Sequence, residues 1–199
     1  MSTEIHVRRG AYLPHWTTEG GTYHIRFRLG DSVPKEQIAL WQMEREDFLL
    51  TKEKSIKLSP FEQRRLKCLS AEKIEKYLDA GHGACWLIRD DVAKLAADAL
   101  WYFNEKRYKL YAWCIMPNHV HVVLQPLTHD LHEIAYSWKW FTAQKMNKII
   151  KRKGELWQRE YFDHLIRDEK YLEKTIEYVW RNPDKAGLKN WKWRWRIDT

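Results

Sequence analysis

Alternation of apolar and polar residues predicts the first strand of a sheet. From residue 23 to residue 29 every second position is apolar, and His24, Arg26 and Arg28 stand between them. Side chains alternate between the two faces of a strand, so a period of two is typical of a strand buried on one face. Gly30-Asp31-Ser32 ends this strand, and residues 1–21 before it show no periodic pattern and are expected to be irregular.

Two further apolar runs predict a β-hairpin. Residues 108–116 have the sequence YKLYAWCIM, residues 119–126 have the sequence HVHVVLQP, and Pro117-Asn118 separates them. Proline and asparagine favour turns, so the two runs are expected to pair as neighbouring strands. A last short strand is predicted within EYFDHLIRD, residues 160–168.

Apolar residues at helical spacing predict the remaining elements. The ranges expected to be helical are 34–50, 60–79, 90–104, 131–152 and 169–181. In the last of these, Leu172, Ile176 and Val179 form an apolar stripe, which is expected to hold the helix against the sheet. Pro183 is expected to end this helix, because the residue before a proline disfavours the α conformation.

The order of these elements predicts the fold class. Strand, helices, strand, strand, helix, strand and helix are typical of an α+β fold with a mainly antiparallel sheet. We expect a ferredoxin-like sheet, as in RNA-recognition motifs, with helices on one face and the other face open, as in nucleic-acid binders. A main domain is expected at 22–188, with an extra helical insert near 34–104, an irregular segment 1–21 and a basic, tryptophan-rich tail 189–199.

Composition narrows the class of protein. Hydrophobic residues make up 44% of the 199 residues and charged residues 31%, which is typical of a globular domain. No apolar run approaches the roughly 20 residues that a membrane span requires. The first residues have no signal-peptide pattern, and the widely spaced Cys68, Cys85 and Cys114 form no CxxC pair. We therefore expect a cytoplasmic protein with reduced thiols and no membrane partner.

The balance of charge indicates a polyanionic partner. The formal net charge is +8, and the chain has 12 tryptophans. No acidic residue occurs from Ile134 to Gly154, and the tail KNWKWRWRIDT alternates basic and aromatic residues. Basic surfaces attract nucleic acid and aromatic rings stack on unpaired bases, so the tail is expected to be a strand or arm with a stacking face. The alternative, in which its tryptophans pack back onto the body, stays open.

Two histidines stand at alternate positions in the second strand of the predicted hairpin. His119 and His121 therefore point to one face, while Val120, Val122 and Leu124 point to the other, toward the core. A buried polar side chain needs a partner, and two imidazoles can share a divalent cation. An H-x-H pair alone does not specify a metal site, because a core histidine with an ordinary partner gives the same pattern.

A second cluster lies in the last predicted helix. Tyr178 and Asn182 are four residues apart, which puts them on one helical face and off the apolar stripe. The amide oxygen of Asn182 is a candidate third ligand, and two nitrogens plus one oxygen suit Mg²⁺ or Mn²⁺. Alternatively, Tyr178 is an interfacial tyrosine and Asn182 terminates the helix. Tyr171, two turns earlier, is a rival nucleophile without an amide one turn away.

This constellation suggests attack by the Tyr178 hydroxyl on a phosphodiester whose oxygens a cation polarises. A 3′-hydroxyl leaves and can later attack the phosphotyrosine to rejoin the strand, so no nucleotide cofactor is needed. A free phenol has a pKa of about 10, so Tyr178 must lose its proton first. The sequence leaves open whether a neighbouring side chain, water or the metal removes that proton.

Longer motifs resemble a known family. MPNHVHVV, residues 116–123, resembles the HUH motif (His, hydrophobic, His) of single-tyrosine transposases. Residues 156–188 resemble the C-terminal half of the REP-associated tyrosine transposases, which are relatives of small bacterial insertion-sequence transposases. The resemblance covers Thr22 to Leu188, and the tail departs from the more usual family ending.

The resemblance implies a ferredoxin-like core that cleaves single-stranded DNA through a 5′-phosphotyrosine linkage. It implies that His119, His121 and Asn182 hold Mg²⁺ or Mn²⁺ and that Tyr178 is the nucleophile. It also implies recognition of short DNA hairpins by a monomer or a homodimer. Trp138 is assigned to the core. The residues expected to contact DNA are Arg26, Arg28, Lys139, Lys145, Lys148, Trp157, Gln158, Arg159 and Lys185.

Three functions stay open at this point. The first is a metal-dependent DNA transposase or single-strand endonuclease that acts on hairpin DNA. The second is a host-retained module that binds hairpin DNA or RNA with little turnover. The third is a metal hydrolase in which His119 and His121 serve a water nucleophile.

Overall fold

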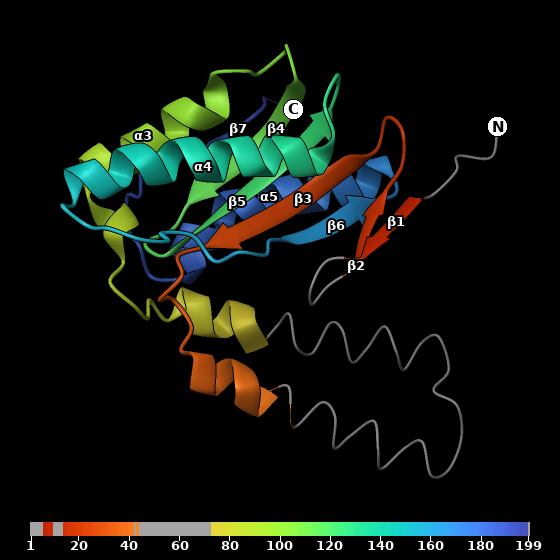
Figure 1. The fold of residues 1–199 in the computed structure, drawn as a ribbon. Helices are drawn as coiled ribbons and strands as arrows, with labels where there is room; N and C mark the ends of the chain where they lie inside the picture. Colours follow the sequence, from red (N-terminus) through yellow and green to blue (C-terminus); the bar gives the residue numbers. More distant parts are fainter. Residues whose placement is uncertain (1–5, 10–13, 42, 44–72, 199) are drawn as a thin grey trace, which may run out of the picture.

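The structure is a computed structural model that describes residues 6–9, 14–41, 43 and 73–198 (Figure 1). The strands are β1 His6–Arg9, β2 Pro14–Thr17, β3 Thr22–Arg28, β4 Tyr108–Ile115, β5 His119–Pro126, β6 Phe162–Ile166 and β7 Arg194–Arg196. The helices are η1 Trp86–Ile88, α3 Asp90–Trp101, α4 Leu131–Ile149 and α5 Glu169–Lys185, with further helical residues at 35–41 and 73–79. The rest of the two helices expected at 34–50 and 60–79 lies largely outside the described residues.

The main sheet has five strands in the order β6-β3-β5-β4-β7, and every neighbouring pair is antiparallel. Its first four strands have the order of a ferredoxin-like βαββαβ unit, in which the first and third strands pair at the centre. The predicted α+β, ferredoxin-like fold class is therefore confirmed. The predicted hairpin is also present, with Pro117 and Asn118 between β4 and β5.

The pairing of β3 with β5 brings polar residues from two distant segments together. Arg26 lies opposite His121, and Arg28 lies opposite His119. Residues directly opposite in an antiparallel pair point to the same face. The polar positions of the first strand therefore share a face with the histidine pair.

One face of the sheet is covered by α3 and α4, which Figure 1 shows in front of the strands. The core on this face joins the sheet residues Ile25, Val122 and Leu124 to Ile134 and Ala135 of α4. Trp138 belongs to the same core and is 3% exposed, as predicted, and its Nε1 donates to the Tyr108 hydroxyl at 2.9 Å. No helix in the described part of the chain is long and apolar enough to cross a membrane.

The opposite face was expected to be open, but α5 lies across it, behind the strands in Figure 1. Ile176 and Val179 pack there against Cys114 and Val123 of the sheet, and Leu172 packs at the edge of the cluster. The predicted apolar stripe of this helix is what covers the face. The exposed face of an RNA-recognition motif is thus replaced by a narrow polar site next to α5.

Two local expectations were wrong. Residues 6–9 and 14–17, expected to be irregular, pair as the antiparallel strands β1 and β2. Helix α5 runs through Pro183 to Lys185 instead of ending before the proline. Proline removes one backbone hydrogen bond and its ring crowds the carbonyl four residues earlier, and the helix ends two residues after it. The chain then leaves the helix at Gly187, which has a φ of 77°.

The tail packs back onto the body. Strand β7 pairs with β4, placing Trp195 opposite Trp113, and the Trp195 ring lies 4.6 Å from that of Trp101. Nε1 of Trp191 donates to the Ile115 carbonyl at 2.7 Å, and Nε1 of Trp193 donates to Asp90 at 3.0 Å. These tryptophans therefore serve the fold and cover the β4 edge, which is the alternative that the sequence left open.

Candidate metal and nucleophile site

The histidine pair lies on the face of β5 that α5 covers. Val120 and Val122 take the opposite face because side chains alternate along a strand. His119 and His121 are each 0% exposed, and their Nε2 atoms lie 2.9 Å apart. Two imidazoles two residues apart thus converge on one point from a rigid central strand.

Asn118 fixes the orientation of His119. The Asn118 Nδ2 atom donates to the carbonyls of Leu78 and His82, at 3.1 Å and 2.9 Å. Its Oδ1 therefore faces Nδ1 of His119, at 2.7 Å. Because an amide oxygen only accepts, Nδ1 of His119 must carry the proton, and Nε2 of the neutral ring keeps its lone pair.

The imidazoles around this point are held neutral. Burial lowers the pKa of His119 and of His121 well below the ordinary value, and the positive charge of Arg26 adds to the effect. A third imidazole, that of His24, lies with its Nε2 atom 3.0 Å from Nδ1 of His121. Burial lowers the pKa of His24 to about 3, so these nitrogens are uncharged at neutral pH.

Helix α5 brings Tyr178 and Asn182 to the same place. The Tyr178 ring centre lies 5.9 Å from those of both His121 and His24. One turn later, Asn182 is 0% exposed, and its Nδ2 donates to the Tyr178 hydroxyl at 3.3 Å. The structure therefore brings together all four residues of the expected constellation. By contrast, Tyr171 lies against His164, with ring centres 5.5 Å apart.

An acidic group reaches the site from residues 73–79, which belong to the helical insert. Oδ1 of Asp79 lies 3.7 Å from Nε2 of His119, and Glu75 pairs with Arg26 at 3.2 Å. Burial and the nearby Glu75 raise the pKa of Asp79 to about 6, against opposing effects of Arg26 and Lys185. The site therefore carries a carboxyl that titrates unusually high.

The residues present fit a hard divalent cation. Oδ1 of Asn182 and Oδ1 of Asp79 are buried and have no hydrogen-bond partner among the described residues. Unpaired buried oxygens are costly and are often explained by an ion. In the described ranges, no group of three or more histidine, cysteine or carboxylate side chains is arranged to hold a metal. The amide oxygen of Asn182 is the candidate third partner for His119 and His121.

Two of the residues expected to contact DNA are buried instead. Trp157 is 5% exposed, packs edge-on against Phe27 and donates to Thr142 at 2.9 Å, so it belongs to the core. Arg26 is 6% exposed and ion-paired with Glu75. Neither side chain is free to meet a phosphate. Both expectations are therefore wrong. Alternation along β3 places Arg26 inside the site, and the loop before β6 turns Trp157 toward the core.

The expected lysines of α4 lie across the sheet from the histidine pair. Lys139 donates to the Arg159 carbonyl at 2.6 Å, and burial lowers its pKa to about 8. Lys145 and Lys148 are exposed. Because α4 and α5 cover opposite faces, these lysines cannot contact a phosphate held at Tyr178.

The remaining expected DNA contacts differ in exposure. Arg28 is half-buried and donates to Ser32 at 3.1 Å, and Gln158 is also half-buried. Arg159 is exposed. Lys185 is exposed as well, and its Nζ lies 4.7 Å from the centre of the Tyr178 ring. Lys185 is thus the expected contact that lies beside the candidate nucleophile.

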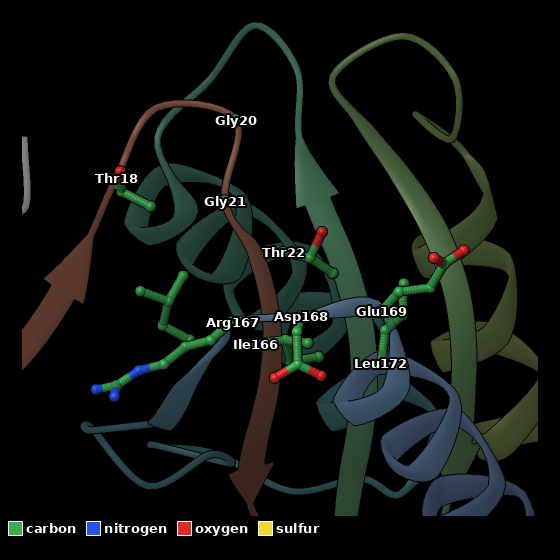
Figure 2. Close-up of a pocket in the computed structure, with 10 residues that line it drawn as sticks. Thr18, Gly20, Gly21, Thr22, Ile166, Arg167, Asp168, Glu169 and Leu172 are labelled. Carbon is green, nitrogen blue, oxygen red and sulfur yellow. The ribbon is translucent and has the colours of Figure 1, made fainter. Parts of the chain in front are cut away.

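A separate open pocket lies at the other end of α5 (Figure 2). It is bounded by the turn before β3, at Gly20 and Gly21, and by the turn from β6 into α5, at Arg167 and Asp168. Asp168 caps the helix by accepting from the Tyr171 N–H at 2.8 Å. A carboxylate thus already occupies the helix end, and the pocket offers no chemistry comparable to the histidine site.

Sequence reasoning missed three participants of this site. Asn118 was interpreted only as a turn residue, although its position directly before the H-x-H pair was a usable signal. His24 was identified only as a polar position of the first strand. Asp79 had no local signal, since it comes from a helix 40 residues before His119 and reaches the site only through the tertiary fold.

Comparison with known proteins agrees with this arrangement. Residues 87–182 match the family model described as "Transposase IS200 like". A Haemophilus influenzae protein assigned to the REP-associated tyrosine transposases is 34% identical over 99 residues, covering 42% of this chain and 56% of that protein. The REP-associated tyrosine transposase of Escherichia coli is 24% identical over 84 residues, covering 42% of this chain and 49% of that protein.

The chain thus spans about half the length of the relatives it matches. A solved structure of a REP-associated tyrosine transposase bound to a REP hairpin shares 14% identity and a TM-score of 0.48, covering 94% of this chain and 80% of that one. The family resemblance seen in the sequence is confirmed over part of the chain: residues 87–182 match the IS200-like transposase model, and the relatives named here are REP-associated tyrosine transposases.

Proposed function

We propose that this chain is a cation-dependent transposase that cleaves and rejoins single-stranded DNA, with Tyr178 as nucleophile. His119, His121 and Asn182 would hold a Mg²⁺ or Mn²⁺ ion. One observation carries the proposal: Nε2 of His119 and Nε2 of His121 converge at 2.9 Å, and α5 sets the Tyr178 ring 5.9 Å from that of His121. A half-buried phenol beside a buried neutral imidazole pair and an unpaired amide oxygen is the kind of cluster that marks functional sites.

The reaction is a transesterification at phosphorus. When bound, the cation polarises the phosphodiester and stabilises charge on its oxygens. The Tyr178 oxygen forms a bond to phosphorus while the bond from phosphorus to the 3′ oxygen breaks, which leaves a 5′-phosphotyrosine and, after proton uptake, a free 3′-hydroxyl. Attack by a 3′-hydroxyl on that adduct reverses the step, rejoins the strand and returns the proton to Tyr178.

Two neighbours favour negative charge on the attacking oxygen. Asn182 donates a hydrogen bond to the Tyr178 hydroxyl at 3.3 Å, and the Lys185 ammonium lies 4.7 Å from the ring centre. A donor and a nearby cation both stabilise the oxygen as its proton leaves. Tyr171 lies instead against His164, with ring centres 5.5 Å apart, whereas Tyr178 lies beside the histidine pair, which supports Tyr178 over its rival.

The proposed substrate is a DNA hairpin with a single-stranded flank, as the family resemblance implies. The formal charge of +8 supports a polyanionic substrate. Exposed cations are proposed to contact its backbone: Lys145 and Lys148 on α4, Arg159, and Lys185 beside Tyr178. The chain is proposed to act as a monomer or homodimer.

Incubation of the full chain with a 5′- or 3′-labelled hairpin oligonucleotide and Mn²⁺ tests the proposal. We expect a covalent protein–DNA band that survives denaturation and requires the cation. Tyr178→Phe should abolish this band while hairpin binding persists. The matched control is Tyr171→Phe, which removes the same hydroxyl from the same helix and should leave the band intact.

Other outcomes select the competing functions. Normal cleavage by Tyr178→Phe would indicate a hydrolase with a water nucleophile. Tight, salt-dependent hairpin binding by the wild type without any cleavage would indicate a binding module. In either case the assignment of Tyr178 as nucleophile would be wrong.

A further inference from the structure

The hydrogen bonds around His121 leave only two arrangements of its proton. His119 is fixed by Asn118 with its proton on Nδ1, so its Nε2 can only accept. Nε2 of His121 lies 2.9 Å from that acceptor, and Nδ1 of His121 lies 3.0 Å from Nε2 of His24. A neutral imidazole carries one proton, which sits either on Nε2 or on Nδ1.

In the first arrangement, Nε2–H of His121 donates to His119, and Nδ1 accepts from Nε2–H of His24. In the second, Nδ1–H of His121 donates to Nε2 of His24, whose own proton is on Nδ1. Both arrangements hold three protons on the three rings. The second leaves the Nε2 lone pairs of His119 and His121 facing each other, which is unfavourable unless a cation lies between them.

We infer that His24 is a positioning residue of the cation site, which accepts the His121 Nδ1–H and so turns the Nε2 lone pair of His121 toward the ion. This inference rests on the proposed function, because it concerns the same site. A ligating histidine usually donates its other N–H to an acceptor, and that contact fixes both ring orientation and tautomer. Here the acceptor is a third imidazole, and cation binding moves one proton within each of two rings.

The fold holds His24 in this role. It lies on β3, at the centre of the sheet, two residues before Arg26, which pairs with His121. The two imidazole planes differ by 15°, with ring centres 5.2 Å apart. The Tyr178 ring lies edge-on to both, at 5.9 Å from each. His24 therefore contacts both His121, a proposed ligand, and Tyr178, the proposed nucleophile. A shift of the His24 ring would change the position of both side chains.

Two variants of His24 distinguish the loss of the hydrogen-bond acceptor from the loss of side-chain volume. His24→Leu fills much of the space without an acceptor, whereas His24→Gln restores an acceptor oxygen at similar volume. The probe is Mn²⁺ alone, titrated into the full chain and followed by calorimetry. Loss of a contact of this kind lowers metal affinity about 10–100-fold, so we expect that loss in His24→Leu and near-wild-type affinity in His24→Gln.

Each possible result of the Mn²⁺ titration has a distinct meaning. If His24→Leu binds Mn²⁺ as the wild type does, or if both variants lose affinity equally, the role of His24 as acceptor is wrong while the proposed function stands. If the wild type binds no Mn²⁺, and His119→Ala behaves identically, the proposed cation site and this inference both fall.

A measurement on the wild-type chain covers the case in which His24→Leu does not fold. Nitrogen-15 chemical shifts of histidine distinguish the Nδ1–H from the Nε2–H tautomer. Addition of Mg²⁺ should move His24 and His121 to the Nδ1–H tautomer and leave His119 unchanged. A His24 ring that keeps its proton on Nε2 in saturating Mg²⁺ would overturn the inference.

Discussion

The amide of Asn182 is half satisfied by Tyr178: its Nδ2 donates to the Tyr178 hydroxyl at 3.3 Å, while its Oδ1 is buried with no hydrogen-bond partner among the described residues. A buried acceptor without a partner costs about 1–3 kcal/mol. The fold accepts this cost next to two converging imidazoles. Such a balance is typical of a position kept for function and not for stability.

Replacing Asn182 with leucine should therefore not harm the metal-free fold. Asn182→Leu removes the unpaired oxygen and loses one hydrogen bond worth about 1 kcal/mol, so the free energy of unfolding should be unchanged or higher by up to about 2 kcal/mol. Urea unfolding in the presence of a chelator measures this. The stabilisation that Mn²⁺ gives the wild type should be lost in the variant.

Thr175→Val is the control for that experiment, because Thr175 lies buried on the same helix and its hydroxyl donates to the Tyr171 carbonyl, at 2.7 Å. Its response to Mn²⁺ should equal that of the wild type. A large loss of stability in Asn182→Leu, above about 2 kcal/mol, would mean that Asn182 is structural.

Asn118 should be structurally essential. Its side chain joins the β4–β5 turn to the Leu78 and His82 carbonyls and also orients His119. Asn118→Ala removes three hydrogen bonds and leaves Nδ1 of the buried His119 without its acceptor, so we expect a loss of about 2–4 kcal/mol in urea unfolding. Asn118→Asp keeps the oxygen that faces His119 but loses both donors, and it should be destabilised without losing the His119 tautomer.

Local patterns predicted much of this fold because they report directly on burial. The alternation in β3 and β5 gave the correct faces for Arg26, His119 and His121, since a strand buried on one side permits no other pattern. The Tyr178 and Asn182 spacing placed both on one face of α5. The candidate site was therefore largely predictable from its two elements.

What the sequence could not show depends on contacts between distant segments. The apolar stripe of α5 predicted packing on the sheet but not on which face. Asp79 reaches His119 from a different helix. The residues next to Trp157 in the sequence are the same whether it faces DNA or the core. Its packing against Phe27, which lies in a distant strand, decides between the two positions. Polar and aromatic residues in loops carry no periodic signal.

The tail should contribute to stability through its tryptophans. The Trp191 indole donates to the Ile115 carbonyl at 2.7 Å, at the end of β4. Trp191→Phe keeps most of the ring but loses this bond, so we expect a loss of about 1 kcal/mol in unfolding free energy. Hairpin affinity should not change, because this indole is bonded to the body of the protein. A weaker affinity would instead place the Trp191 ring on the DNA.

The metal-free protein should lose stability as the pH falls from 7 to 5. Burial lowers the pKa of His24 to about 3, and those of His119 and His121 well below the ordinary 6.5, with Arg26 adding to each effect. Below pH 6.5 the unfolded chain binds protons that the folded chain excludes, so stability is lost as the pH drops. Asp79 acts in the opposite direction, because its pKa is raised to about 6 and the folded state keeps its proton.

Three histidines outweigh one carboxyl, so urea unfolding in a chelator should show a decrease of about 2–4 kcal/mol between pH 7 and pH 5. His24→Leu should reduce this decrease by up to about 2 kcal/mol, because one of the three excluded protons is removed from the balance. A wild-type stability that is flat across this range would mean that the three imidazoles take up protons in the folded state, and neutral rings could then no longer be assumed when a cation binds.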